Sequence, residues 1–563
     1  MRKFLALLVL IAAGTAWYVF SWIPSRYQAD LDAFIAALKP RQELTYGSFE
    51  LDVLGKRARL KDVELKNPEA KSSLLAKTLT VSPADDGKKV DAEATMLEFR
   101  TPDATMTARV AVFRNLSLAH REGVPFPTEH AEIVKAIGFG SVQMRDLTSD
   151  ALKIASIDAT GLEGGLLKTI SFRDISLGTD QDTFRLGTAS AEAINIPQFF
   201  SLPALSEPEK LTAALAGLHV GPIATKDFAA KIKKNEASIA LASVEFDGLD
   251  KGRVARLAVS GFNVSGKKDG GPAFAVELDH FAIDDFPFVL TQPDSFDYEG
   301  IVAWKKKFGI DRIGGVDLKR FRVKTDDGQF GIDKIAVPKP VYRKSPGGVF
   351  YAAKSSVEVD LGLDTALLAK MAKRIPPAVL ASWNHERINM RIAGASSMDA
   401  ESGTGSIDHM SIGIDHLAEL RLRGSYAGLP VAAFEAPEMP GMLESALKTF
   451  EIRNAELTLV NASLVQRLIG AFAAQQGLTV PAATQALARA AVINMTRDRD
   501  PVMVPMAREI VAFLRDPKSL TLSIAPRAGF PIVALQDPRL AQRPGAVGKI
   551  LNLSAKANAP ANP

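Results

Sequence analysis

A short pattern recurs along the chain, in which two apolar residues at alternate positions precede a basic residue, an Asp or Asn, and a further apolar residue. Apolar alternation with a period of two is typical of a β-strand with one buried face. Repeated copies therefore predict a repetitive β-sheet, and this constrains the fold more than any other feature. The copies stand at 59–63 (RLKDV), 113–116 (FRNL), 142–147 (VQMRDL) and 170–175 (ISFRDI), with weaker ones at 223–228 and 452–455 and one without the basic residue at 244–249.

The alternation slips by one residue inside each copy. In the fourth copy the apolar residues are Ile170, Phe172, Ile175 and Leu177, so the spacing runs two, three, two. A β-bulge or a tight turn at the slip would return the later residues to the apolar face. Asp and Asn suit this position because they tolerate left-handed backbone angles and hydrogen-bond to their own main chain. We therefore interpret the following residues as structural, not as a catalytic or metal-binding array: Asp62, Asn115, Asp146, Asp174 and Asp227.

The first 25 residues predict a transmembrane anchor. Residues 4–23 (FLALLVLIAAGTAWYVFSWI) are uncharged, and as a helix they are long enough to cross a hydrocarbon core of about 30 Å. Trp17, Tyr18 and Trp22 cluster at the end of this run, where membrane interfaces favour aromatic rings, and Pro24 ends the helix. A single-pass membrane protein is the resulting prediction.

A cleaved secretory signal is the alternative reading of the same segment. Gly14, Thr15 and Ala16 would form its cleavage site, although the hydrophobic run continues beyond Ala16 and is longer than a usual signal core. In both cases Arg2 and Lys3 stay in the cytoplasm and the body of the protein is exported.

The remaining periodicities predict the order of the segments. The anchor at 1–25 is followed by an amphipathic helix at 26–40 and a β-rich repetitive body at 41–435. Short helices are expected at 129–137, 208–216 and 365–375, and flexible joints at 266–272, 345–348 and 396–405. Residues 436–553 form a helical segment flanked by strands, and residues 554–563 a disordered tail. The fold class is mainly β (α+β), with an elongated antiparallel sheet after the transmembrane helix.

Composition narrows the function classes. The chain has 68 Lys and Arg against 64 Asp and Glu, and the net charge of +4 forms no basic stripe interleaved with aromatic residues. Nucleic acid is therefore not expected as a partner. The chain has no Cys, which excludes a thiol nucleophile, a thiolate metal site and disulfide bonds.

No catalytic motif is complete in the sequence. A G-x-S-x-G nucleophile elbow is absent, and the segment HERIN at 385–389 lacks the second His of the zinc-protease motif. Three aliphatic-Asp-His tripeptides end at His280, His409 and His416. If the last two lie on one strand, their odd spacing directs them to opposite faces. We predict no enzyme activity and no catalytic, cofactor-binding or metal-ligating residues.

The membrane helix, the amphipathic exit helix and strand pairs of the type seen at 51–65 (LDVLGKRARLKDVEL) resemble the AsmA-like inner-membrane proteins of Gram-negative bacteria and related uncharacterised anchored periplasmic proteins. The resemblance covers about the first 80 residues and the repeated turn pattern, and the segment 462–516 is not part of it. It implies a long curved sheet with an apolar inner face that handles lipids between the two membranes of the envelope, with a periplasmic body.

Three function classes remain open from the sequence. A lipid-binding or lipid-transfer protein of envelope biogenesis needs an open apolar groove and has membrane lipids as partners. A non-catalytic envelope scaffold needs only a closed core and patches for other envelope proteins. An enzyme assembled from scattered residues needs a polar cleft with convergent titratable groups.

Overall fold

A computed structural model describes most of residues 43–118, 130–200, 208–289, 312–364, 387–431 and 446–559, with short gaps, together with residues 35, 36 and 295. The described chain is mainly β, with 26 strands, and every recorded strand pairing is antiparallel. Contacts divide the chain into two compact units. Unit 1 comprises Met1–Gly271 with Phe288–Thr291, and unit 2 comprises Pro272–Pro287 with Gln292–Pro563.

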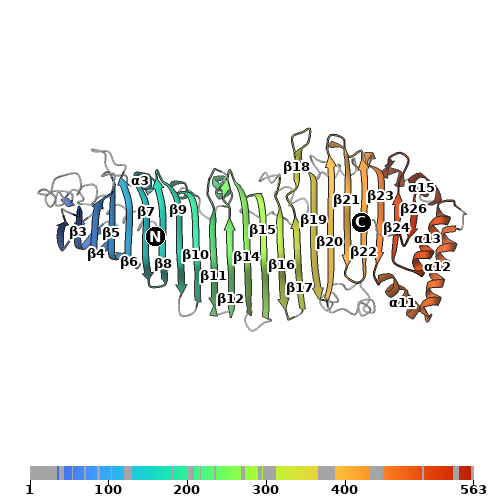
Figure 1. Ribbon diagram of the computed structural model, residues 1–563, viewed down its shortest axis with the longest axis horizontal. Coiled ribbons are helices and arrows are strands. Elements are labelled where there is room, and N and C mark those ends of the chain that lie inside the picture. Colours follow the sequence, from blue (N-terminus) through green and yellow to red (C-terminus); the bar gives the residue numbers. More distant parts are fainter. Residues whose placement is uncertain are drawn as a thin grey trace. The chain divides into compact units, whose positions relative to one another are not determined.

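Unit 1 is a meander in which successive long strands pair side by side (Figure 1). The first two strands both pair with β3, and β13 pairs with β14, which itself pairs with β12. The strands are β1 (Glu43–Thr45), β2 (Ser48–Asp52), β3 (Arg57–Asn67), β4 (Ser72–Pro83), β5 (Val90–Arg100), β6 (Thr105–Leu118), β7 (Ile137–Ser149), β8 (Leu152–Glu163), β9 (Leu166–Gly178), β10 (Asp182–Asn195), β11 (Ile223–Ile232), β12 (Ala237–Phe246), β13 (Leu249–Asp250) and β14 (Arg253–Lys267). The helices are α3 (His130–Ala136), α4 (Ile196–Phe200) and α5 (Pro208–Leu215).

Unit 2 is a second meander, which ends in helices packed beside its last strands. Its strands are β15 (Ala273–Pro287), β16 (Val316–Thr325), β17 (Gly328–Val337), β18 (Val341–Lys344), β19 (Phe350–Asp364), β20 (Arg387–Asp399), β21 (Thr404–Ile414), β22 (Ala418–Ala427), β23 (Glu451–Asn461), β24 (Ser519–Ile524), β25 (Phe530–Pro531) and β26 (Ser554–Ala557). Its helices are α11 (Leu464–Gln476), α12 (Val480–Thr496), α13 (Met503–Arg515), the 3-10 helix η3 (Ile532–Gln536) and α15 (Pro544–Leu551).

The slip residues that the repeat predicts have the expected left-handed backbone. Their φ angles are 50° at Asp62, 53° at Asn115, 53° at Asp146, 51° at Asp174 and 58° at Asp227. Such angles are uncommon for residues other than Gly, and Asp and Asn adopt them more readily than most. The prediction of a local backbone role for these five residues is confirmed.

The slips at Asp62, Asp146, Asp174 and Asp227 are aligned from strand to strand as a crease across the sheet, and Asn115 lies outside this row. The pairs on either side of Asp174 place it opposite Gly187, and the pairs on either side of Gly187 place that residue opposite Asp227. A Cβ on Gly187 would meet Asp227 Cβ at 2.9 Å, so the crease requires a small residue there. Met96 and Gly261 continue the same row, with φ angles of 49° and 64°.

Of the two forms expected for the slip, a β-bulge or a tight turn, the bulge is absent at four of the five positions. Only Asn115 lies beside a register shift, whereas at Asp62, Asp146, Asp174 and Asp227 the paired strands advance by equal numbers of residues. The alternation of apolar side chains therefore shifts by one residue in both strands of each pair, and neither strand has an inserted residue. The apolar positions stay on one face on both sides of the crease because each strand slips at the same row.

The inner face of β3 to β8 is a closed hydrophobic core. Leu60, Phe113 and Met144 are at most 1% exposed, and they belong to one continuous cluster of buried residues. Val134 of α3 and Ile196 of α4 pack against this cluster. The short helices near these strands thus contribute to the core.

Several expected segments are confirmed and others are corrected. Helices α3 and α5 lie at the predicted places, and the division between the units at Gly271 and Pro272 falls inside the stretch expected to be a joint. The joint expected at 396–405 is wrong, because β20 and β21 occupy most of it as a hairpin. The disordered tail is wrong for Ser554–Ala557, which pairs with β24 as β26 and so satisfies an edge of the sheet.

The predicted membrane anchor at 1–25, nearly all of the exit helix at 26–40 and the helix at 365–375 lie outside the described residues. Within the described part, no helix combines the length and the apolar character needed to cross a bilayer.

The structural role of the crease can be tested at Asp174. We expect Asp174→Ala to lower the free energy of unfolding of unit 1 by about 1 kcal/mol, because alanine cannot form the local hydrogen bonds that favour the left-handed angle. Asp174→Gly is the matched control and should unfold close to wild type, since glycine adopts this angle without strain. Urea titration followed by circular dichroism measures both variants. Wild-type stability of Asp174→Ala would contradict the structural role.

Candidate functional site: a half-exposed apolar strand face

The inner face of β9 to β14 carries four rows of side chains that run from strand to strand and are apolar except for Thr225. Two rows lie on each side of the crease, and the residues they contain include no charged group. The rows are Leu177, Phe184, Ala230, Ile239 and Val264; Ile175, Leu186, Phe228 and Leu241; Phe172, Ala189, Thr225, Val244 and Val259; and Ile170, Ala191, Ile223, Phe246 and Leu257.

These rows are open where the rows of β3 to β8 are closed. Leu177 is 46% exposed, and the other row residues are half-buried except Ala230, which is buried. Ile170, Phe172 and Ile175 form the transition, since they pack against the closed core without being enclosed by it. Unit 1 therefore has a closed core at its first strands and a half-exposed apolar face at its later ones.

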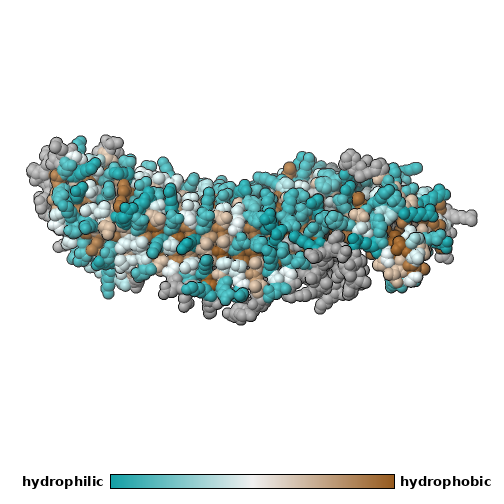
Figure 2. Space-filling model, turned by 60° about the horizontal axis from the view of Figure 1, so that its bottom comes forward, coloured by the Kyte–Doolittle hydropathy of each residue, from teal (hydrophilic) through white to brown (hydrophobic). Residues whose placement is uncertain are grey.

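Figure 2 shows hydrophobic residues as a band that crosses the strands of unit 1, with hydrophilic residues on both sides. The alternation of each strand explains this arrangement, because successive side chains point to opposite faces. On β10, for example, Arg185, Thr188 and Ser190 are exposed on the outer face, whereas Leu186 and Ala189 belong to the inner rows.

Unit 2 has an apolar face of the same kind. One row crosses nine strands, from β15 to β24, without a polar residue, and its members are half-buried or exposed. Ile412 and Leu420 in this row are 39% and 42% exposed. The row consists of Phe281, Leu318, Ile335, Val359, Ile392, Ile412, Leu420, Leu459 and Leu520.

The outer face of unit 1 carries ionic contacts. Arg145 donates hydrogen bonds of 2.9 Å to both carboxylate oxygens of Asp158, and Ser156 donates a third at 3.2 Å. The Arg145 guanidinium is the main reason that the pKa of Asp158 lies below its usual value. Arg109 and Asp146 pair in the crease row itself. These pairs brace neighbouring strands and do not converge on a cleft.

The histidines of the three Asp-His tripeptides are placed apart. His280 lies 3.7 Å from Asp317 across β15 and β16, and His409 is exposed on β21. His416 is not on that strand, because it occupies the turn before β22 with a φ of 62°. The expectation that His409 and His416 share one strand is therefore wrong. In the described part of the chain no three His, Asp or Glu side chains are grouped as metal ligands would be.

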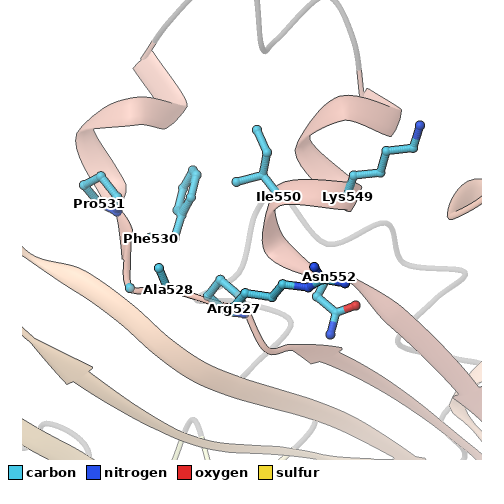
Figure 3. A pocket seen from close by; sticks show the side chains of 9 residues that line it. Arg527, Ala528, Phe530, Pro531, Lys549, Ile550 and Asn552 are labelled. Atoms are coloured by element: carbon cyan, nitrogen blue, oxygen red, sulfur yellow. The ribbon is translucent and has the colours of Figure 1, made fainter.

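A pocket of about 680 Å³ lies in unit 2 between the loop after β24, strand β25 and the end of α15. Figure 3 shows Phe530 and Ile550 on its walls and the side chains of Arg527 and Asn552 close together at its base. Arg527 and Lys549 supply positive charge, and the lining contains no acid or histidine. The pocket thus lacks a proton acceptor for general acid–base chemistry and is apolar and cationic in character.

The sequence pointed to Ile170, Phe172, Ile175 and Leu177 of the apolar face but not to the long row of unit 2. The missed signal was plain alternation, as in 357–364 (VEVDLGLD), where apolar residues occupy every second position. These strands lack the basic-Asp element of the repeat, so a search for that element passes over them.

A protein-family model described only as "Uncharacterized protein" matches residues 411–558. This region runs from β21 to the end of β26 and includes α11, α12, α13 and α15. Comparison with curated proteins gives no significant match. The matched family begins within the half-exposed apolar face and continues through the helical segment.

Proposed function

We propose that this protein binds the acyl chains of membrane lipids along its half-exposed apolar face. The observation that carries the proposal is the row from Phe281 to Leu520, which presents nine apolar side chains on nine neighbouring strands. At about 4.8 Å per strand the row is roughly 38 Å long. One leaflet of a hydrocarbon core is about 15 Å thick, so the row is longer than an extended acyl chain.

Acyl chains supply what the sheet lacks on this face. Apolar surface gains about 25 cal/mol per Å² when it is removed from water, so a chain that covered about 300 Å² would gain roughly 7 kcal/mol before its ordering cost. Large exposed apolar surfaces on folded proteins usually have an occupant. The uniform lack of charge along the rows fits a hydrocarbon chain better than a polar ligand.

An envelope scaffold is the second candidate. The closed core of β3 to β8 is what such a protein needs, and other envelope proteins would then cover the half-exposed face. Neither function requires a catalytic residue or a cofactor, and we propose none.

Lipid extraction distinguishes the two candidates. We expect phospholipid to copurify with the chain and to be detected by mass spectrometry after solvent extraction, because the apolar rows remain covered during purification. The control is a variant with Leu186→Asp and Leu420→Asp, purified in the same detergent, which corrects for lipid carried by the N-terminal hydrophobic segment. Equal lipid in both samples would favour the scaffold.

The proposed location is the inner membrane, with a single span at the N-terminus and the body in the periplasm. The uncharged run at 4–23 supports this proposal. We expect a reporter that is active only outside the cytoplasm to be active when fused after Lys39, and the protein to stay with membranes during alkaline washing. Release by alkali would exclude the anchor, and a mature N-terminus at Trp17 would identify a cleaved signal.

A further inference from the structure

Positive charge is concentrated in the helical end of the chain. Residues 462–559 contain 12 Lys and Arg against 5 Asp and Glu, a net of +7, whereas the whole chain has a net charge of +4. The rest of the chain, residues 1–461 and 560–563, therefore has a negative net charge, because +4 minus +7 is −3. The segment 462–496, which holds α11 and α12, contains no acidic residue at all. Charge asymmetry of this kind indicates a surface for a polyanion or an anionic membrane.

The same helices expose large aliphatic side chains. Leu468 of α11 is 51% exposed, and Val480 and Ile493 of α12 are 50% and 67% exposed. Leu478, between the helices, and Val492 are each 41% exposed. On α12, Val492 and Ile493 lie near the C-terminal end on the side of Arg489, whereas Val480, the first residue of the helix, points about 140° away from Ile493.

The pocket between β25 and α15 places further basic residues near the start of α13. Gly548 of α15 lies against Val502, the residue before α13, because a Cβ on Gly548 would meet Val502 Cγ1 at 3.0 Å. The chain reaches α13 directly from α12, so the end of α12 with Ile493 and the pocket with Lys549 lie at the same end of α13. Arg489, Arg527 and Lys549 are exposed, and no described residue forms an ion pair with any of them.

We propose that the helical segment 462–559 docks on the surface of an anionic lipid bilayer. Val492 and Ile493 of α12 enter the interface, and the arginines and lysines contact the phosphate groups. Aliphatic insertion combined with basic residues is the usual chemistry of interfacial helices, and each basic residue near an anionic surface adds to the attraction.

A bilayer fits this surface better than the other anionic or apolar partners. Nucleic acid is contacted through basic residues and stacking aromatic rings, but residues 462–559 contain no Trp or Tyr. A second copy of the chain would bring two segments of charge +7 together. The proposal does not depend on lipid in the apolar face, because Val492, Ile493, Arg489 and Lys549 lie outside the rows.

The test uses the full-length chain, held by its N-terminal segment in nanodiscs of neutral phosphatidylcholine. The chain has no cysteine, so Ile493→Cys gives a single site for an environment-sensitive NBD fluorophore. On addition of vesicles that contain phosphatidylglycerol, we expect a blue shift and a rise in fluorescence on the order of twofold. Vesicles of phosphatidylcholine alone should give little change. Ser190→Cys, on the exposed outer face of β10, is the label control and should not respond.

A charge-reversal variant distinguishes electrostatic attraction to anionic vesicles from nonspecific adsorption. Arg489→Glu combined with Lys549→Glu should weaken vesicle binding by about tenfold or more, with an unchanged melting temperature, because each reversal removes a cation and adds an anion. Three results overturn the proposal: an equal response to neutral vesicles, a response that grows with protein concentration in the absence of vesicles, or a response to a DNA oligonucleotide alone. None of these results changes the lipid content of the apolar face, so the two proposals fail separately.

Discussion

Leu60→Asp is expected to unfold the first unit. Leu60 is 1% exposed in the closed core of β3 to β8, so the substitution removes a buried aliphatic side chain and leaves a carboxylate without a partner. The first loss costs about 2–5 kcal/mol, and the unpaired charge adds several more. Whole domains are stable by only about 5–15 kcal/mol. We expect loss of the cooperative unfolding transition of unit 1 in urea, with protein recovered mainly in inclusion bodies.

The matched control is Leu177→Asp, which makes the same chemical change on the same face. Leu177 is 46% exposed at the end of β9, where the face is open and water can reach the carboxylate. We expect the cooperative urea transition of unit 1 to persist, with its free energy of unfolding lowered by about 1 kcal/mol at most. If both variants unfolded equally, the face of unit 1 would be closed at β9 as well, and the lipid proposal would rest on the row of unit 2 alone.

The strand content and the crease could be predicted from sequence because both are local. A period of two identifies a strand with one apolar face, and the slip at Asp174 requires a backbone angle that Asp tolerates. The form of the crease could not be predicted in this way. It depends on Gly187 and Ala242 in the neighbouring strands, and only the register shows that they face the slip residues.

The tail shows a different limit of sequence reasoning. Residues 554–563 are rich in Ala, Asn and Pro, a composition typical of disorder. Four of them nevertheless pair with β24 as β26, and Ala557 N–H also donates to the Glu509 carboxylate of α13 at 2.8 Å. An open strand edge and a helix stabilise this segment, and neither is visible in its own sequence.

The apolar face was only half predictable for the same reason. Alternation shows that Ile170 and Phe172 share one face, but it does not show whether another layer covers them. The structure has both states in unit 1, with Phe113 1% exposed and Phe172 half-buried. The hydrophobic periodicity of the two strands is similar, so the difference comes from packing between distant segments.

Phe172→Asp is expected to abolish lipid binding on the half-exposed face of unit 1 while the protein stays folded. Phe172 lies in an inner row between Ala189 and Ile157 of the neighbouring strands, at the transition from the closed core to the open face. A carboxylate there stays hydrated, and an acyl chain that passed over it would have to strip that water at a cost of several kcal/mol. We expect the lipid signal above that of the Leu186→Asp, Leu420→Asp control to fall, and the lipid on the row of unit 2 to remain.

Two further variants at or near this site make the result specific. Phe172→Leu keeps the row apolar and should retain lipid, and Ser190→Asp places the same charge on the exposed outer face of β10 and should also retain it. Melting curves of all three variants decide the interpretation. If Phe172→Asp unfolds and the wild-type protein carries no lipid beyond the control, residues such as Phe172 belong to an ordinary core, and the scaffold becomes the better account of the molecule. If Phe172→Asp stays folded and carries less lipid while Ser190→Asp and Phe172→Leu keep the wild-type amount, the inner face of unit 1 is a binding surface, because the charge weakens binding only on that face.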